Sequence, residues 1–180
     1  TAGALVVPDA VRLPSGALLS VAAALQERAL SAVAGGPVIR GILLSVDRLV
    51  STPAAKRALR ERTGAVAVDM ESGPVLAAAA ARGLPALVVR GVADTADDSV
   101  SPELASLIDE RGRLRIERAA RVAIGRPDLL PQALRMALAS RRALRAVAQV
   151  LVALQQLLSE PERRTDVASR QSESAGSRTP

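Results

Sequence analysis

The sequence predicts a mixed α/β fold, and three runs of residues near its middle carry the prediction. Residues 64–68 are short, apolar and β-branched, which is typical of a buried strand. Residues 72–82 are alanine-rich strong helix formers, and the run stops at Gly83 and Pro85. Residues 87–92 form a second apolar run of strand length. The order strand, helix, strand predicts a right-handed parallel unit.

Acidic side chains follow both of these predicted strands. Asp69 and Glu71 come after the first strand, and Asp94, Asp97 and Asp98 come after the second. Ligands of parallel α/β sheets bind outside the carboxyl ends of the strands. We therefore expect the two groups of carboxylates to face one crevice.

The segments before this unit alternate in the same way. Residues 1–11 contain a predicted strand, and residues 18–34 have the apolar spacing of an amphipathic helix. Residues 37–50 are predicted to form one long strand or two short strands joined at Gly41. Residues 54–62 are predicted to form a helix, because capping residues and a proline precede them.

The chain after the unit divides into two parts. Residues 127–159 carry leucines at helical spacing and several arginines, which predicts an amphipathic helical segment distinct from an α/β domain over residues 1–126. This helix either packs on the sheet or a partner subunit or lies on an anionic membrane surface, and the sequence leaves both alternatives open. Residues 160–180 contain almost no apolar side chains, which predicts a disordered tail.

Composition limits the chemistry. The 180 residues are 49% hydrophobic, enough for one globular core, yet they include no Phe, Tyr, Trp, His or Cys. Thiol nucleophiles, zinc thiolate sites and catalytic triads are therefore excluded, and the chemistry depends on carboxylates and arginines. The net charge is +6, and Lys56 is the only lysine. Without aromatic side chains to stack bases, we expect no specific nucleic-acid site.

Several motifs resemble the nucleoside phosphorylase and nucleosidase superfamily. They are G-I-L-L-S-V-D-R-L-V from Gly41, V-D-M-E-S-G from Val68, and V-V-R-G-V-A-D-T-A-D from Val88. The resemblance implies a three-layer sandwich with a central mixed sheet. It covers residues 3–153 and corresponds to the C-terminal part of the family domain, with the family's N-terminal strands missing.

Within the superfamily, the hopanoid-associated nucleosidases are most similar. Their members resemble S-V-D-R-L-V-S-T-P-A-A-K-R-A-L from Ser45 and R-P-D-L-L-P-Q-A-L-R-M-A-L-A-S-R-R-A-L from Arg126. This branch is understood to cleave adenine from adenosylhopane, so the resemblance implies cleavage of a purine N-glycosidic bond in hopanoid biosynthesis. The alternatives are a methylthioadenosine or adenosylhomocysteine nucleosidase, a true phosphorylase, and a non-catalytic truncated relative.

The resemblance also implies roles for two catalytic residues. Asp94 matches the acid that protonates the leaving purine, and a well-placed general acid contributes about 10²–10⁴ in rate. Arg90 matches an arginine near the attacking water or phosphate; a structural pairing of Arg90 with Asp69 or Glu71 is the alternative. The family's serine before the acid is Ala93 here, which removes a hydroxyl that could orient the carboxyl group.

Four further positions match substrate-binding residues. Glu71 corresponds to the carboxylate that accepts hydrogen bonds from the ribose hydroxyls, and Met70 to the side chain that packs on the sugar. Leu49 and Val50 correspond to the wall of the purine pocket, where the family places an aromatic residue at the first of them. For Met70, Leu49 and Val50, ordinary core packing is the alternative.

The remaining expectations concern partners and location. The resemblance implies a small nucleoside substrate, free or lipid-linked, and water or phosphate as the nucleophile. No metal-ligand set, dinucleotide loop or P-loop occurs, so we expect no metal and no cofactor. The resemblance implies a homo-oligomer. Because no spanning or signal segment is evident, we expect a cytoplasmic protein with peripheral membrane contact through residues 127–159 as an option.

Overall fold

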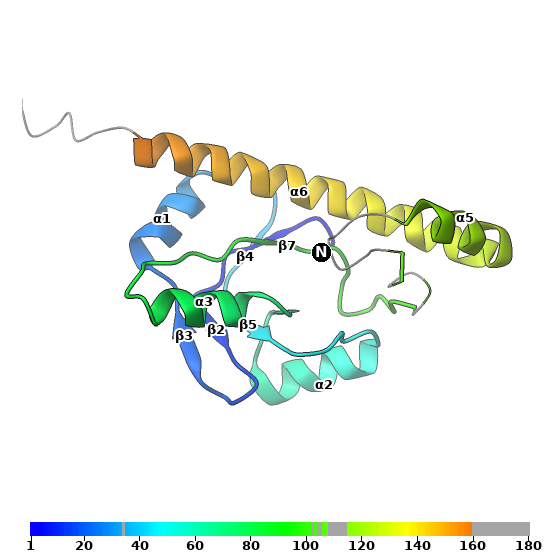
Figure 1. Ribbon diagram of the computed structural model, residues 1–180, viewed down its shortest axis with the longest axis horizontal. Coiled ribbons are helices and arrows are strands. Elements are labelled where there is room, and N and C mark those ends of the chain that lie inside the picture. The colour runs from blue at the N-terminus through cyan, green and yellow to red at the C-terminus, as the bar shows by residue number, and fades with distance from the viewer. Residues whose placement is uncertain (34, 102, 104–105, 108–114, 160–180) are drawn as a thin grey trace, which may run out of the picture.

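The structure is a computed structural model, and it describes residues 1–33, 35–101, 103, 106–107 and 115–159. Small β-sheets lie between helices on two sides, which confirms the predicted mixed α/β fold (Figure 1). The strands are β1 (Leu5–Val6), β2 (Ala10–Arg12), β3 (Leu18–Ser20), β4 (Val38–Ile39), β5 (Ile42–Ser45), β6 (Ala67–Asp69) and β7 (Arg90–Gly91). The helices are α1 (Ala23–Ser31), α2 (Pro53–Thr63), α3 (Ser72–Ala80), α5 (Ile116–Gly125), the 3₁₀ turn η1 (Pro127–Leu129) and α6 (Leu130–Ser159).

The strands form a three-stranded sheet in the order β4-β1-β7 and a four-stranded sheet in the order β3-β2-β5-β6. Strand β1 pairs in parallel with β4, and β2 pairs in parallel with β5. Hydrogen bonds also bridge the gap between these pairs, from Val7 N–H to Ile39 O at 3.0 Å and from Asp9 N–H to Gly41 O at 2.9 Å. Residues 5–12 and 38–45 are therefore two long parallel segments that join the two sheets.

Between its paired residues, the first long segment has one residue more than the second. Leu5 lies opposite Val38, whereas Ala10 lies opposite Ile42, so residues 7–9 face only residues 40–41. Such an extra residue is a β-bulge, and Pro8 suits it because proline has no N–H to leave unpaired. The buried side chain of Gln26 donates a hydrogen bond to the Pro8 carbonyl at 2.9 Å, which satisfies the bulge's acceptor.

Two core clusters lie on opposite faces of these sheets. The segment before β7 shows this directly, since Leu87 and Val89 pack with the first cluster and Val88 belongs to the second. The first cluster joins the sheet to α1 and α6, and the second joins it to α3. The buried members of the first are Leu5, Val7, Ala29, Val150 and Leu154, and those of the second are Val11, Val21, Leu43, Leu76 and Val88.

The helix predicted over residues 18–34 is wrong in its first part. Residues Leu18–Ser20 form β3, which pairs antiparallel with β2, and helix α1 begins only at Ala23. A turn explains the difference: Leu13 N–H donates to Ala17 O at 2.8 Å, and Gly16 N–H donates to Leu13 O at 2.9 Å. The hairpin places residues 18–20 beside β2 before the chain can start a helix. Residue 34 lies outside the described residues.

The predictions for residues 37–50 and for the helix over residues 54–62 are confirmed. Residues 37–50 contain two short strands, β4 and β5, joined at Gly41, whose φ of 129° is one that favours glycine. Helix α2 begins at Pro53, and the Thr52 hydroxyl accepts the Ala55 N–H at 3.3 Å as its N-cap. Proline at the first helical position loses no hydrogen bond, because that N–H has no partner within a helix.

The predicted parallel strand–helix–strand unit is wrong. Strand β6 and helix α3 form as expected, but β6 lies in the four-stranded sheet and pairs in parallel with β5. Strand β7 is only two residues long, lies in the other sheet and runs antiparallel to β1. The rule of right-handed crossovers applies to parallel strands of one sheet, so it does not govern this connection.

The C-terminal helix α6 crosses over β7 and α1 (Figure 1). Its buried face consists of Ala139, Ala143, Val150 and Leu154, and the last two belong to the core cluster of β1. The leucines of the predicted stripe divide between two faces, because Leu130, Leu134, Leu138, Leu144 and Leu151 are exposed. Within the described residues, no helix combines the length and hydropathy that crossing a membrane requires. The tail predicted over residues 160–180 lies outside them.

Substitution of Gly91 tests the contact between β7 and α6. A Cβ atom at position 91 would lie 2.5 Å from Ala143 Cβ and 3.2 Å from Ala143 Cα, so the backbone of α6 must move. We expect Gly91→Ala to lower the free energy of unfolding by about 1–2 kcal/mol, the cost of overpacking a fixed contact. Urea unfolding followed by circular dichroism measures it. Gly125→Ala is the matched control, because a Cβ there meets open space, and an unchanged Gly91→Ala midpoint would contradict the packing described.

Candidate active site

The predicted site residues lie on three segments. Leu49 and Val50 follow β5, Met70 and Glu71 connect β6 to α3, and Arg90 and Asp94 lie on and after β7. Because β6 and β7 belong to different sheets, their ends do not meet as neighbours of one parallel sheet. Side-chain ion pairs instead connect the β7 segment to the residues between β6 and α3 and to helix α2.

Arg90 connects β7 to the start of α3. Its Nε atom lies 3.0 Å from Asp69 Oδ2, and its Nη2 atom hydrogen bonds to Glu71 Oε2. The Asp69 side chain is only 5% exposed, whereas that of Glu71 is 62% exposed. A buried carboxylate is costly without partners, so Arg90 stabilises Asp69, and Glu71 presents its carboxylate to solvent. The arginine pairs with both acids that the sequence offered as its structural partners.

Asp69 also organises the first turn of α3. Its carboxylate accepts the Ser72 N–H at 3.2 Å and is hydrogen bonded to the Ser72 hydroxyl. A carboxylate that accepts an otherwise unpaired N–H stabilises the beginning of a helix. The adjacent Gly73 N–H donates to Ser45 Oγ of β5 at 3.0 Å. The V-D-M-E-S-G motif is thus fixed at its ends, and Met70 and Glu71 lie between the fixed points.

Asp94 belongs to a second cluster, and Lys56 of α2 is at its centre. The Lys56 ammonium pairs with Asp94 Oδ2 and donates to the carbonyls of Thr95 at 2.8 Å and Asp98 at 2.7 Å. The Lys56 side chain is 9% exposed and that of Asp94 is 31% exposed. Sequence reasoning missed Lys56 as a site residue, although its being the only lysine was a visible signal.

The carboxylates next to Asp94 in sequence have other partners. Asp97 is 90% exposed and lies 3.7 Å from an Arg57 nitrogen. The Asp98 carboxylate turns back to the Thr95 N–H and hydroxyl, at 2.7 Å each. Asp97 and Asp98 therefore pair elsewhere, and the charged group that pairs with Asp94 is Lys56. Asp98 closes the turn that carries Asp94.

The turn predicts a pH effect on stability. The pKa of Asp98 is lowered chiefly by the Thr95 N–H, then by the Thr95 hydroxyl and by the charges of Lys56 and Arg135, against the opposing effect of burial. A lowered folded pKa means that the stabilisation is complete above the unfolded value near about 3.9 and is lost as the pH falls through the folded value. We expect Asp98→Ala to cost about 1 kcal/mol at neutral pH and progressively less below about pH 4. Urea unfolding of both proteins across that range measures the difference, and a constant difference would contradict it.

The positions matched to the base and sugar are open to solvent. Leu49 is 53% exposed and Met70 is 43% exposed, while Val50 is half-buried. Core packing, the alternative for Leu49 and Met70, is therefore wrong for both. Large apolar side chains that remain exposed beside charged groups are surfaces that a ligand can cover.

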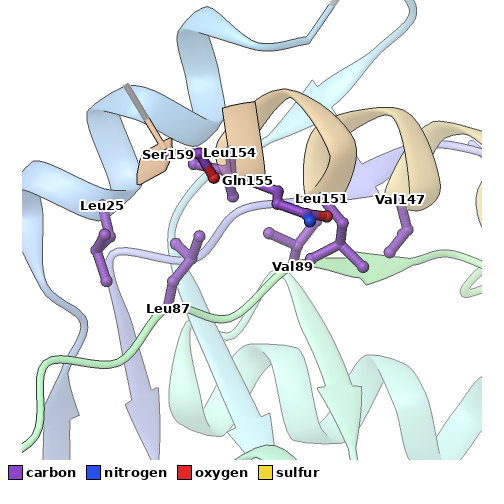
Figure 2. A pocket seen from close by; sticks show the side chains of 8 residues that line it. All are labelled: Leu25, Leu87, Val89, Val147, Leu151, Leu154, Gln155 and Ser159. Atoms are coloured by element: carbon purple, nitrogen blue, oxygen red, sulfur yellow. The ribbon is translucent and has the colours of Figure 1, made fainter. Parts of the chain in front are cut away.

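A groove on the other face of the β7 segment has a different character (Figure 2). It has a volume of about 530 Å³, and apolar side chains from α1, from the segment before β7 and from α6 line it. They are Leu25, Leu87, Val89, Val147, Leu151 and Leu154, and the polar residues Gln155 and Ser159 also line the groove. Among the described residues, the lining of the groove includes none of the predicted site residues and no charged side chain, so this lining offers no acid for bond cleavage.

Comparison with known protein families then decides the affiliation. The family model described as the phosphorylase superfamily matches residues 4–125. The chain belongs to the phosphorylase superfamily. The match contains every site residue described above, from Leu49 to Asp98. A search of curated proteins finds no match.

Solved structures share the fold. The 5'-methylthioadenosine/S-adenosylhomocysteine nucleosidase of Neisseria meningitidis, in complex with methylthio-immucillin-A, has a TM-score of 0.55 and 18% identity over 84% of this chain and 62% of its own. The MTA/SAH nucleosidase of Streptococcus pneumoniae, in complex with 8-aminoadenine, has a TM-score of 0.56 and 17% identity over 86% and 61%. The futalosine hydrolase of Helicobacter pylori has a TM-score of 0.56 and 15% identity over 84% and 60%. The chain thus spans about three fifths of the length of these three proteins.

Proposed function

We propose that the chain carries the acid and the ribose-binding carboxylate of a purine nucleosidase. The observation that carries the proposal is the pair of ion-paired clusters within the superfamily match, one presenting Glu71 and the other holding Asp94. Arg90 and Asp94 lie four residues apart on one segment, so the two clusters share a short, fixed piece of backbone. The fold of the nucleosidases described above supports the same reaction class.

The proposed reaction is cleavage of the bond between C1′ and the purine. The bonding electron pair leaves with the base, and Asp94 donates a proton to a ring nitrogen of the base, which avoids release of a purine anion. A water molecule adds its oxygen to C1′ and releases a proton to solvent, from which Asp94 regains the proton that it donated, so the products are free base and free sugar. Glu71 accepts hydrogen bonds from the ribose hydroxyls, and Arg90 orients Glu71 and attracts the nucleophile. Met70, Leu49 and Val50 cover the sugar and base.

We propose adenosylhopane as the substrate, on the sequence resemblance to the hopanoid-associated branch. The alternative substrates are methylthioadenosine and adenosylhomocysteine, the compounds named for two of the similar structures. Ala93 and the replacement of an aromatic residue by Leu49 favour the further alternative of a non-catalytic relative.

Chromatography of released adenine tests the reaction and the substrate together. The purified chain is incubated with adenosylhopane, methylthioadenosine or adenosylhomocysteine, each with and without phosphate. We expect adenine release from adenosylhopane that does not depend on phosphate. Faster release of adenine from methylthioadenosine or adenosylhomocysteine would identify that nucleoside as the substrate in place of adenosylhopane. Dependence of the release on phosphate would indicate a phosphorylase. No release by a folded sample would identify a non-catalytic relative.

We also propose that α6 contacts an anionic bilayer, because it exposes leucines and arginines together. Leu134, Leu138 and Leu144 are exposed on this helix, as are Arg141 and Arg145. Exposed apolar side chains bordered by positive charge suit an anionic lipid surface. We expect co-sedimentation with phosphatidylglycerol vesicles but not with phosphatidylcholine vesicles, and loss of it in a Leu134→Ser, Leu138→Ser double variant. A dimer that binds neither vesicle would instead make this face an interface between copies.

A further inference from the structure

Lys56 is the only lysine in a chain with 24 lysine and arginine residues, and it is nearly buried. It lies on the first turn of α2, and its side chain is 9% exposed. A buried ammonium group is costly unless each of its N–H groups finds an acceptor. Burial of Lys56 therefore requires hydrogen-bond acceptors around its ammonium group.

All the donors of Lys56 point to one segment. An ammonium group has three hydrogen-bond donors, and the three acceptors are the Asp94 carboxylate, the Thr95 carbonyl and the Asp98 carbonyl. Three acceptors around one nitrogen suit the compact ammonium group, whereas the planar guanidinium of arginine spreads its donors over a wider fork. The geometry explains why this one position holds lysine where the chain otherwise uses arginine.

The helix that carries Lys56 is itself fixed next to the same segment. Thr52 caps α2, and its carbonyl accepts the Lys56 N–H at 3.0 Å. The preceding carbonyl, that of Ser51, accepts the Val100 N–H at 2.8 Å. The segment 94–100 is thus attached to the beginning of α2 at both of its ends. Contacts with the beginning of helix α2 therefore hold Asp94, which lies beyond the end of strand β7.

We propose that Lys56 is a positioning residue for Asp94. It binds Oδ2, so that the other carboxyl oxygen, Oδ1, is directed to the base of the nucleoside. No hydrogen bond to Oδ1 is recorded among the described residues, whereas Oδ2 is occupied by the ammonium group. The inference rests on the proposed function, in which Asp94 is the acid, and adds a residue to which the motifs assigned no role.

Kinetics of Lys56 variants test the proposal. We expect Lys56→Met, which keeps the stem and loses the donors, to reduce kcat for adenine release by about 10²-fold, the scale of a misplaced catalytic group, with KM changed by less than about twofold. Ethylammonium should restore turnover of Lys56→Ala in a saturable way, an effect that a purely structural role does not produce. Arg57→Met, whose partner Asp97 is exposed, is the matched control with unchanged kinetics. An unchanged kcat in a folded Lys56→Met protein would overturn the proposal and leave the proposed function intact.

A second measurement does not require activity. Labelling with nitrogen-15 lysine gives a single side-chain ammonium resonance, because there is one lysine. We expect slow hydrogen exchange of that resonance and faster exchange after Asp94→Ala, but no change after Asp97→Ala. Fast exchange of the Lys56 ammonium protons in the wild type would show that the three hydrogen bonds do not hold this group, and would overturn the proposal. A protected ammonium in a protein that cleaves no nucleoside would overturn the catalytic role together with the proposed function and leave only a structural contact.

Discussion

An Asp94→Asn variant is expected to release adenine about 10²–10⁴-fold more slowly than the wild type, the usual contribution of a general acid. Asparagine is almost the same size as aspartate, and its amide oxygen can still accept the Lys56 N–H that now reaches Oδ2. The variant therefore keeps the arrangement of the segment and loses the transferable proton. Chromatography of the released base under saturating nucleoside measures the loss in kcat.

The control for this variant is Asp97→Asn on the same turn. Asp97 is 90% exposed, and its pair with Arg57 at 3.7 Å is one that solvent screens strongly. The rate of adenine release by the Asp97→Asn variant should stay within about twofold of the wild-type rate. Equal rates for Asp94→Asn and the wild type would remove Asp94 as the acid. A large loss in Asp97→Asn would show that the turn, and not the carboxyl group of Asp94, limits the rate.

Removal of Arg90 is expected to have the largest effect on stability. Arg90→Met leaves Asp69, which is 5% exposed, without its ionic partner. Loss of one partner from a buried pair costs about 3–5 kcal/mol, and because Arg90 is 39% exposed we expect about 3 kcal/mol. Urea unfolding measures this as a lower midpoint. Turnover should fall as well, because Glu71 loses the guanidinium that holds it.

A double variant separates the charge effect from the packing effect. Asp69→Asn in the Arg90→Met background removes the unpaired charge while the side chain can still accept from Ser72. We expect it to recover about half or more of the lost stability, since contacting residues show strong coupling. An additive loss would mean that Arg90 acts mainly through the packing of its apolar stem.

Local signals predicted several elements correctly from sequence. Thr52 and Pro53 gave the start of α2, and Gly41 gave the junction of β4 and β5, because capping and positive φ are properties of single residues. The superfamily was also recognised from short motifs, whereas the roles of Glu71 and Asp94 stay predictions. These features depend on residue type and near neighbours, which a sequence contains.

Long-range pairing set the features that the sequence did not predict. Strand β3 forms because residues 18–20 meet β2, and β7 runs antiparallel to β1 because segments about 85 residues apart along the chain pair, Leu5 with Gly91. The role of Lys56 required the approach of α2 to residues 94–98, which no local pattern encodes. Tertiary context overrides local propensity in such places.

The bulge at Pro8 makes the fold sensitive to chain length at one point. Leu5 and Val7 pack towards α6, whereas Val11, an even number of residues further on, packs towards α3. Side chains of a strand alternate between faces, so the extra residue between Val6 and Ala10 reverses the alternation and lets one strand supply both cores. Deletion of a single residue there would turn Val11 away from its core, together with its neighbours in β2, while the side chains of β1 keep their faces. A scan of substitutions alone would never reveal this constraint, but a scan of deletions would.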